Sequence, residues 1–246
     1  MNSITVVSYI NTFPFIYGIE KSGILLPSDY QLTKVYPSLC AQAYYNRMAE
    51  IVLLPSGAIN HFDELITIKG NCIGAEGKVK SVMLFSQKPI EDVKTLILDY
   101  QSTTSNKLVK ILAKFYWRKK FDFLSSNKGY EEKINDDVAV LVIGDRALNL
   151  MGKYNYNYDL ATEWFNFQQL PFVFAYWVKT KPIDLNFIEK FNKALKWGLQ
   201  HKQEALETYL HADQILLDYL MNDISYNFDE QKMEGLKAFY SLSNEI

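Results

Sequence analysis

The sequence is poor in cysteine and has no excess of positive charge. Its two cysteines, Cys40 and Cys72, stand in no paired spacing with each other or with histidine, so neither a zinc site nor a disulfide framework is expected. The 26 Lys and Arg residues face 28 Asp and Glu residues, which gives a formal charge of -2. Nucleic-acid binding through bulk charge is therefore excluded, because neutralising phosphates needs a basic excess or a basic stripe.

Long apolar runs are also missing. No run approaches the roughly 20 residues of a membrane helix. The opening residues, MNSITVVS, lack the basic and apolar regions of a secretion signal. We therefore expect a soluble, cytoplasmic protein that does not insert into a membrane.

The familiar motifs of several enzyme classes are absent too. There is no G-x-S-x-G, no phosphate loop ending in Gly-Lys-Ser/Thr, no G-x-G-x-x-G after the first apolar run and no H-E-x-x-H. The three histidines are His61, His201 and His211, and the last two fall in polar segments where a surface role is expected. Hydride transfer, NTP hydrolysis and zinc peptidase chemistry are therefore not predicted.

The composition that remains is that of a folded protein. Hydrophobic residues make up 48% of the 246 residues and charged residues 22%, far from the disordered class. A chain of this length can bury roughly 70–75% of its unfolded surface. Aromatic residues reach 15%, which predicts either a cleft lined by rings or a core that uses Phe and Tyr for bulk.

Apolar, β-branched runs alternate with segments of helical spacing, the pattern of an α/β protein whose parallel strands are covered on both faces. No linker is visible, so we expect two lobes joined by extended strands across a hinged, central cleft, with a C-terminal helical block. The tyrosine-rich segment 154–158 is expected to be a surface loop. Lobe I is predicted to hold residues 1–87 and 176–246, and lobe II residues 88–175. The clearest predicted strands are 4–8, 51–54, 82–86, 95–99, 138–143 and 172–178.

Three strand ends run directly into helix starts, at Tyr9-Ile10-Asn11-Thr12, at Ser102-Thr103-Thr104-Ser105 and at Gly144-Asp145. In an open α/β sheet ligands lie beyond the carboxyl ends of the strands, and helix N-termini there favour a bound anion. The plainer alternative is that these residues only cap helices, as Asn, Asp, Ser and Thr commonly do. Four consecutive hydroxyl residues exceed what one cap needs, however, and so favour a cleft for a small anionic molecule.

Five segments within the first 177 residues carry a recognisable order of motifs: Val7–Thr12 with Pro14, Gly77–Ser86, Asp99 with Ser102–Ser105, Leu141–Leu148, and Leu170–Trp177. Together they resemble the chorismate dehydratase family of menaquinone biosynthesis, whose members begin with a V-x-Y-L-N-T-x-P-like motif. This sequence departs from the family pattern at Ile10, at Gln168-Gln169 and at an inserted-looking Tyr100-Gln101.

The resemblance implies a two-lobed fold like that of the type II periplasmic binding proteins. It implies a lyase that removes water from chorismate to give 3-[(1-carboxyvinyl)oxy]benzoate in the futalosine route to menaquinone. No cofactor is implied, and the partner is the small-molecule substrate. Two alternatives stay open: a non-catalytic small-anion (solute) binding protein, and the later futalosine-pathway enzyme of the same fold.

The resemblance also suggests roles for particular residues. Asn11 and Ser81 are expected to be catalytic and to hold the substrate's carboxylates. The substrate's own enolpyruvyl carboxylate is the expected proton acceptor, with His61, Asp145 and Glu163 as the protein alternatives. The expected substrate-binding residues are Tyr9, Thr12, Ser102, Thr103, Thr104, Ser105, Gly144 and Asp145.

Overall fold

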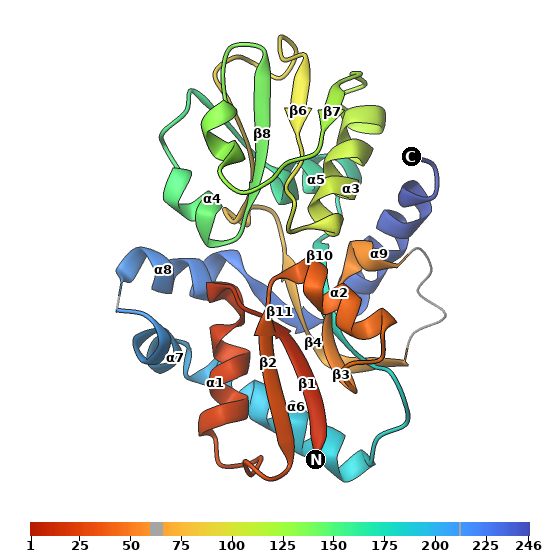
Figure 1. The fold of residues 1–246 in the computed structure, drawn as a ribbon, viewed down its shortest axis with the longest axis vertical. Coiled ribbons are helices and arrows are strands. Elements are labelled where there is room, and N and C mark those ends of the chain that lie inside the picture. Colours follow the sequence, from red (N-terminus) through yellow and green to blue (C-terminus); the bar gives the residue numbers. More distant parts are fainter. Residues whose placement is uncertain (60–65, 212) are drawn as a thin grey trace.

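The chain folds around two β-sheets, one in each half of the molecule (Figure 1). The computed structural model describes residues 1–59, 66–211 and 213–246. One sheet has six strands in the order β11-β4-β10-β3-β1-β2, and the other has five in the order β7-β6-β8-β5-β9. The predicted α/β class is confirmed. Within the described ranges, no helix is both long and apolar enough to cross a membrane.

Both sheets mix parallel and antiparallel strands, which corrects the expectation of parallel sheets. In the six-stranded sheet, β1 runs parallel to β2 and β3, whereas β10 runs antiparallel to β3 and β4. In the five-stranded sheet, β6 is parallel to β7 and β8, whereas β5 is antiparallel to β8 and β9. The physical reason is that β5 and β10 enter their sheets from the other half of the molecule.

The first sheet consists of β1 (Asn2–Val7), β2 (Tyr30–Val35), β3 (Ile51–Pro55), β4 (Ile66–Ala75), β10 (Phe172–Lys179) and β11 (Ser225–Phe228). The second consists of β5 (Val82–Ser86), β6 (Thr95–Ile97), β7 (Asp122–Leu124), β8 (Val138–Ile143) and β9 (Tyr156–Asp159). The tyrosine-rich segment is thus not a simple surface loop, because its second half pairs with β5 as an edge strand.

The chain passes between the sheets earlier than the sequence suggested. Because β5 pairs with β8 and β9, the first crossing lies in residues 76–81 and not after residue 87. The return lies in residues 169–171 and not at 175/176, since β10 joins the first sheet from Phe172 onward. An apolar run that is buried on both faces does not reveal which strand it pairs with. The first crossing is instead visible in the backbone, because Gly77 and Lys80 have positive φ angles.

Helices cover both sheets, and two of them approach unusually closely. The α-helices are α1 (Phe13–Lys21), α2 (Pro37–Tyr45), α3 (Thr103–Ile111), α4 (Asp145–Leu150), α5 (Leu160–Gln168), α6 (Leu185–Gln200), α7 (Lys202–Tyr209), α8 (Gln214–Asp218) and α9 (Glu230–Ser243). A Cβ on Gly18 of α1 would lie 2.0 Å from the Ala194 carbonyl oxygen of α6. This contact anchors α1, whose N-terminal end carries the Tyr9–Thr12 turn.

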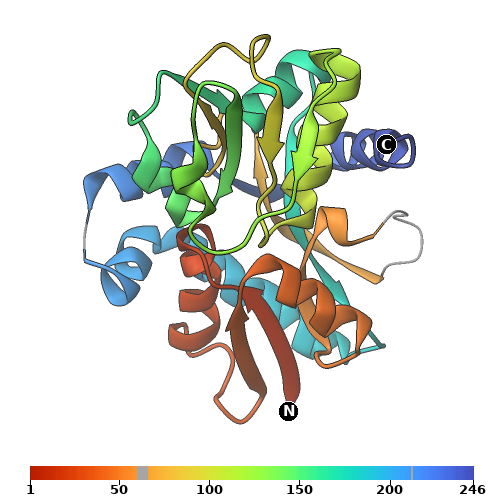
Figure 2. The same cartoon turned by 45° about the horizontal axis from the view of Figure 1, so that its top comes forward.

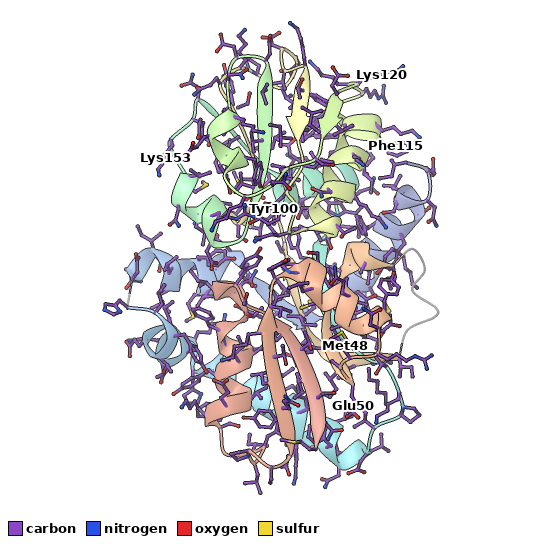
Figure 3. The ribbon with its side chains drawn as sticks, viewed as in Figure 1. Met48, Glu50, Tyr100, Phe115, Lys120 and Lys153 are labelled. Atoms are coloured by element: carbon purple, nitrogen blue, oxygen red, sulfur yellow. The ribbon has the colours of Figure 1, made fainter. Side chains whose placement is uncertain are left out.

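The two halves share one hydrophobic core. Its main cluster includes Leu54 and Trp177 from the first sheet and Leu84 and Leu141 from the second. A smaller cluster covers the other face of the second sheet. The C-terminal helix α9 contacts both β10 and α3 and so also bridges the halves (Figure 1, Figure 2). Charged side chains such as Lys120 and Lys153 project from the surface (Figure 3).

Candidate active site

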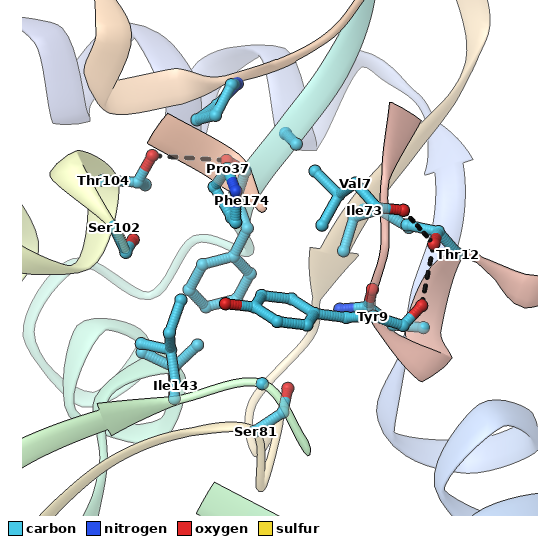
Figure 4. Close-up of a pocket in the computed structure, with 15 residues that line it drawn as sticks. Val7, Tyr9, Thr12, Pro37, Ile73, Ser81, Ser102, Thr104, Ile143 and Phe174 are labelled. Atoms are coloured by element: carbon cyan, nitrogen blue, oxygen red, sulfur yellow. Dashed lines mark hydrogen bonds between the residues drawn. The ribbon is translucent and has the colours of Figure 1, made fainter. Parts of the chain in front are cut away.

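A pocket that is partly open to solvent lies between the two sheets (Figure 4). The pocket is lined by Val7, Tyr9, Asn11, Thr12, Pro37, Pro55, Ile73, Ser81, Val82, Ser102, Thr104, Ile143, Gly144, Phe174 and Ala175. The three turns singled out in the sequence therefore meet at one place. Of the predicted site residues, Thr103, Ser105 and Asp145 are not among those that line it.

Asn11 places an unused polar atom in this pocket. Its side-chain oxygen Oδ1 is buried and has no hydrogen-bond partner among the described residues. The turn that carries it is held by Thr12, whose hydroxyl donates to the carbonyl oxygens of Val7 at 2.5 Å and Tyr9 at 2.7 Å. The Tyr226 hydroxyl also donates to the Asn11 carbonyl oxygen at 2.9 Å. The backbone is thus fixed while the amide oxygen stays available, so Thr12 has a structural role.

Ser81 reaches the pocket from the crossing between β4 and β5. Its side chain is almost fully buried, and its Oγ accepts a hydrogen bond from the Tyr219 hydroxyl at 2.8 Å. The Asp159 carboxylate accepts from the backbone N–H groups of Val79 and Lys80 at 2.8 and 2.7 Å. These two hydrogen bonds stabilise Lys80 at φ 58°, an unfavourable value for a residue with a side chain. The crossing therefore presents Ser81 in one orientation.

Tyr9 forms a wall that reaches across from the first half to the second. Its hydroxyl donates to Gln101 Oε1 at 2.6 Å, and its ring lies so close to Gly144 that a Cβ there would be 2.9 Å away. Gln101 Oε1 also accepts from Arg146 at 2.9 Å. Burial, with a smaller contribution from the charge of Asp99, raises the pKa of the Tyr9 phenol, which keeps it protonated as a donor. Sequence reasoning had treated Gln101 only as a departure from the family pattern.

The four consecutive hydroxyl residues do not supply four free hydroxyls. Ser102 caps α3 by accepting from the Ser105 N–H at 3.1 Å, and its hydroxyl donates to Ser105 Oγ at 2.9 Å. Thr104 Oγ1 accepts from the Gly57 N–H at 2.9 Å and so ties α3 to the first half of the molecule. Thr103 is exposed. Capping and packing therefore account for most of this run.

The two acidic alternatives, Asp145 and Glu163, are not among the residues that line the pocket. Asp145 Oδ1 accepts from the Ile10 N–H at 3.1 Å, and burial raises the pKa of its carboxyl to about 6. Glu163 accepts from the Trp117 indole at 2.8 Å. His201 stacks on Trp197 with ring centroids 3.9 Å apart. The remaining two histidines are His211, which is exposed, and His61, which lies outside the described residues.

The pocket is electrostatically neutral along its described wall. None of its lining residues is Asp, Glu, His, Lys or Arg. Nor do residues 1–59, 66–211 and 213–246 contain a group of three or more His, Cys, Asp and Glu side chains suited to a metal ion. Two lining residues that the site predictions did not include, Ile73 and Phe174, add to its apolar surface. The arrangement suits a small molecule held by hydrogen bonds to neutral groups.

Several solved structures share the fold of this chain. An Archaeoglobus fulgidus protein matches with a TM-score of 0.78 at 14% identity, covering 99% of this chain and 97% of that one. A Candida albicans protein described as exhibiting the generic periplasmic binding protein structural fold matches with a TM-score of 0.63 at 12% identity, covering 100% and 90%. The aliphatic sulphonate binding protein SsuA of Escherichia coli gives 0.59 at 11% identity, covering 100% and 92%. The expected periplasmic-binding-protein-like fold is confirmed.

Sequence comparison identifies the family. A curated relative from Thermus thermophilus, named chorismate dehydratase, is 27% identical over 210 residues, which cover 74% of this chain and 74% of the relative. The family model described as menaquinone biosynthesis matches residues 3–245, nearly the whole chain. The protein therefore belongs to the menaquinone biosynthesis family.

Proposed function

We propose that this protein is a chorismate dehydratase, which removes water from chorismate to give 3-[(1-carboxyvinyl)oxy]benzoate. The family and the Thermus thermophilus relative support this reaction. The observation that carries the proposal is the buried, unpartnered Oδ1 of Asn11 beside Ser81. A buried polar atom without a partner costs about 1–3 kcal/mol, so a ligand that donates a hydrogen bond to this oxygen, as the hydroxyl group of chorismate can, recovers that cost.

Neutral groups supply the contacts that a dianion needs. Ser81 offers a hydroxyl donor to a carboxylate, and Asn11 Oδ1 offers an acceptor to the substrate's hydroxyl group. The first turn of α3 adds unpaired N–H groups and a partial positive charge near Ser102. Each charge-assisted hydrogen bond contributes about 1.5–3 kcal/mol. A few such bonds therefore hold both carboxylates without a lysine or arginine in the described wall.

Positioning is the protein's main task in the proposed reaction. A ring proton leaves, its C–H electron pair enters the ring, and the allylic hydroxyl departs as water after taking up a proton. The product is aromatic, which supplies driving force from the substrate itself. We propose that the enolpyruvyl carboxylate accepts the ring proton, because no carboxylate or histidine lies along the described pocket wall. Substrate orientation can then replace the roughly 10²–10⁴-fold contribution of a protein base.

Asp145 is the strongest protein alternative as the base. Its raised pKa of about 6 suits proton transfer near neutral pH, but its Oδ1 is held by Ile10. An Asp145→Asn variant separates the two routes, since it retains an oxygen for Ile10 and cannot accept a proton. We expect it to keep turnover within about tenfold of the unmodified protein. Loss of turnover with intact chorismate binding would favour Asp145 as the base.

The direct test mixes purified protein with chorismate and follows product by chromatography with mass detection. We expect a product lighter than chorismate by one water, above the rate of a protein-free control. Asn11→Ala should remove this product. Its matched control is Asn192→Ala, because Asn192 Oδ1 is also buried and unpartnered but lies outside the pocket. Binding of intact chorismate without turnover would instead identify a binding protein.

A further inference from the structure

Tyr219 links the C-terminal part of the chain to the candidate active site. It lies on the π-helical turn η6 (Tyr219–Asp223), and its side chain is almost fully buried. The sequence indicates only that Tyr219 belongs to the apolar face of a helix. In the structure its hydroxyl donates to Ser81 Oγ at 2.8 Å, a contact between residues 138 positions apart.

The direction of this bond decides what Ser81 can do. Because the Ser81 oxygen accepts from Tyr219, the hydroxyl hydrogen of Ser81 points elsewhere, and it has no acceptor within the described part of the chain. Ser81 lines the pocket, so this hydrogen is available to a bound anion. A serine hydroxyl that also accepts a hydrogen bond is a stronger donor, since bonds in a chain polarise one another.

The side chain of Asn11 also forms a hydrogen bond with the Tyr219 phenol. Burial raises the pKa of Tyr219, and hydrogen bonding by the side chains of Ser81 and Asn11 acts in the opposite direction. The only donor of an asparagine side chain is its NH₂ group, so an amide that faces the phenol turns its oxygen away. The unpartnered Oδ1 of Asn11 agrees with this orientation.

We propose that Tyr219 is a positioning residue that fixes the Ser81 hydroxyl as a hydrogen-bond donor to the substrate's carboxylate. Its buried phenol holds the serine oxygen in place, so that the serine hydrogen is directed into the pocket. The inference rests on the proposed chorismate dehydration and adds a residue to that site.

A second contact holds the same two segments together without the phenol. Asp223, at the end of η6, is buried and pairs with Lys80 at 2.7 Å, and Lys80 directly precedes Ser81. The Asp159 carboxylate also accepts a hydrogen bond from the Lys80 N–H. Removal of the Tyr219 hydroxyl should therefore leave the positions of residues 76–81 and of η6 unchanged. A Tyr219→Phe variant consequently tests the hydrogen bond and not the fold.

The experiment is a double-mutant cycle on chorismate turnover with Tyr219→Phe, Ser81→Ala and the combination. We expect Tyr219→Phe alone to lower kcat roughly tenfold. In the Ser81→Ala background the same change should lower kcat by less than about threefold, because a residue that acts through Ser81 has nothing left to position. Thermal unfolding of each variant checks that it is folded.

Two controls separate positioning from a general structural effect. Tyr240→Phe removes another buried phenol, which pairs with Tyr176 at 2.9 Å away from the pocket, and it should leave kcat within about twofold in both backgrounds. A fluorotyrosine at position 219 retains the hydroxyl and should also keep kcat within about twofold, which assigns the loss to that group even if the Phe variant is unstable.

The outcomes are distinguishable. A similar loss from Tyr219→Phe in both backgrounds, or no loss in either, overturns the positioning role while the proposed reaction stands. Absence of turnover by the unmodified protein overturns the proposed reaction and the inference with it.

Discussion

The two polar walls of the pocket differ in how far their hydrogen-bonding groups are already used. On one wall, Asn11 Oδ1 has no partner and the Ser81 hydrogen has no acceptor within the described residues. On the other, the hydroxyls of Ser102 and Thr104 are engaged in capping α3 and in bonding Gly57. The difference teaches that a polar sequence motif marks a site only where the fold leaves its atoms unsatisfied.

The two walls also differ in what holds them. The wall formed by Asn11 and Ser81 is held by hydrogen bonds from two tyrosines of the C-terminal part of the chain, Tyr226 and Tyr219. The α3 wall is supported by the cap within its own first turn and by the bond between Thr104 and Gly57. We therefore expect substitutions on the first wall to change turnover and substitutions on the second to change stability.

The largest expected effect is on the first wall, at Asn11. Asn11→Ala should lower kcat by about 10²–10³-fold, the usual cost of removing one preorganised polar group that contacts developing charge. Chorismate turnover of this variant and of Asn192→Ala, each with a denaturation curve, is the measurement. Equal losses in both variants would contradict a specific role for Asn11.

Ser81→Ala should have the next largest effect on turnover. Loss of one charge-assisted hydrogen bond should reduce kcat/KM roughly 10–100-fold. Ser86→Ala is the matched control, because Ser86 is a buried serine in β5 whose hydroxyl donates to the Lys88 carbonyl oxygen at 2.7 Å, outside the pocket. Steady-state kinetics of the pair compares the residue directly before β5 with the last residue of that strand. A weaker effect at Ser81 than at Ser86 would remove Ser81 from the site.

The Gly144-Asp145 turn should make the stability of the protein depend on pH. Burial raises the pKa of Asp145 from 3.8 to about 6, so between these pH values the folded protein binds more protons than the unfolded chain. Ionisation of Asp145 therefore lowers the stability as the pH rises through this range. Asp145→Asn should increase the free energy of unfolding by about 1–2 kcal/mol near pH 7.5 and by much less near pH 4. Urea denaturation at several pH values measures it, and a gain that grows towards acid pH would contradict the sign.

The smallest effects are expected on the α3 wall. Ser102→Ala removes the cap and should cost about 1 kcal/mol of stability, with a smaller loss of turnover than Ser81→Ala. Thr103→Ala, at the neighbouring exposed position, should change neither stability nor turnover. Thermal unfolding and turnover of both variants complete the comparison. A larger loss of turnover at Ser102 than at Ser81 would reverse the roles of the two walls.

Much of the fold was predictable because its signals are local. Apolar runs identified six strands, Pro14 marked the start of α1, and the three strand-to-helix turns pointed to the pocket. The strand partners were not predictable. Val82–Ser86 is buried throughout, and such a run fits either sheet equally well. Strands β2, β4, β7, β9 and β11 were missed, and three of them, β2, β7 and β9, are edge strands without a buried residue.

The site was predictable only in part for a related reason. The family resemblance predicted Asn11 and Ser81 as site residues from their type and order. Nothing near Tyr219 in the sequence relates it to Ser81. Likewise, the hydroxyl run at Ser102–Ser105 has the same sequence whether its groups are free or engaged.

By itself, the sequence determined the α/β class, the positions of the turns and the neutral chemistry of the residues that the turns supply, because these depend on neighbouring residues and side-chain type. Only the tertiary structure decided which polar atoms remain unpartnered. That outcome depends on contacts between distant segments, such as Tyr219 with Ser81 and Gly57 with Thr104, and a hydrogen-bonding group becomes available to a ligand only when no such contact satisfies it.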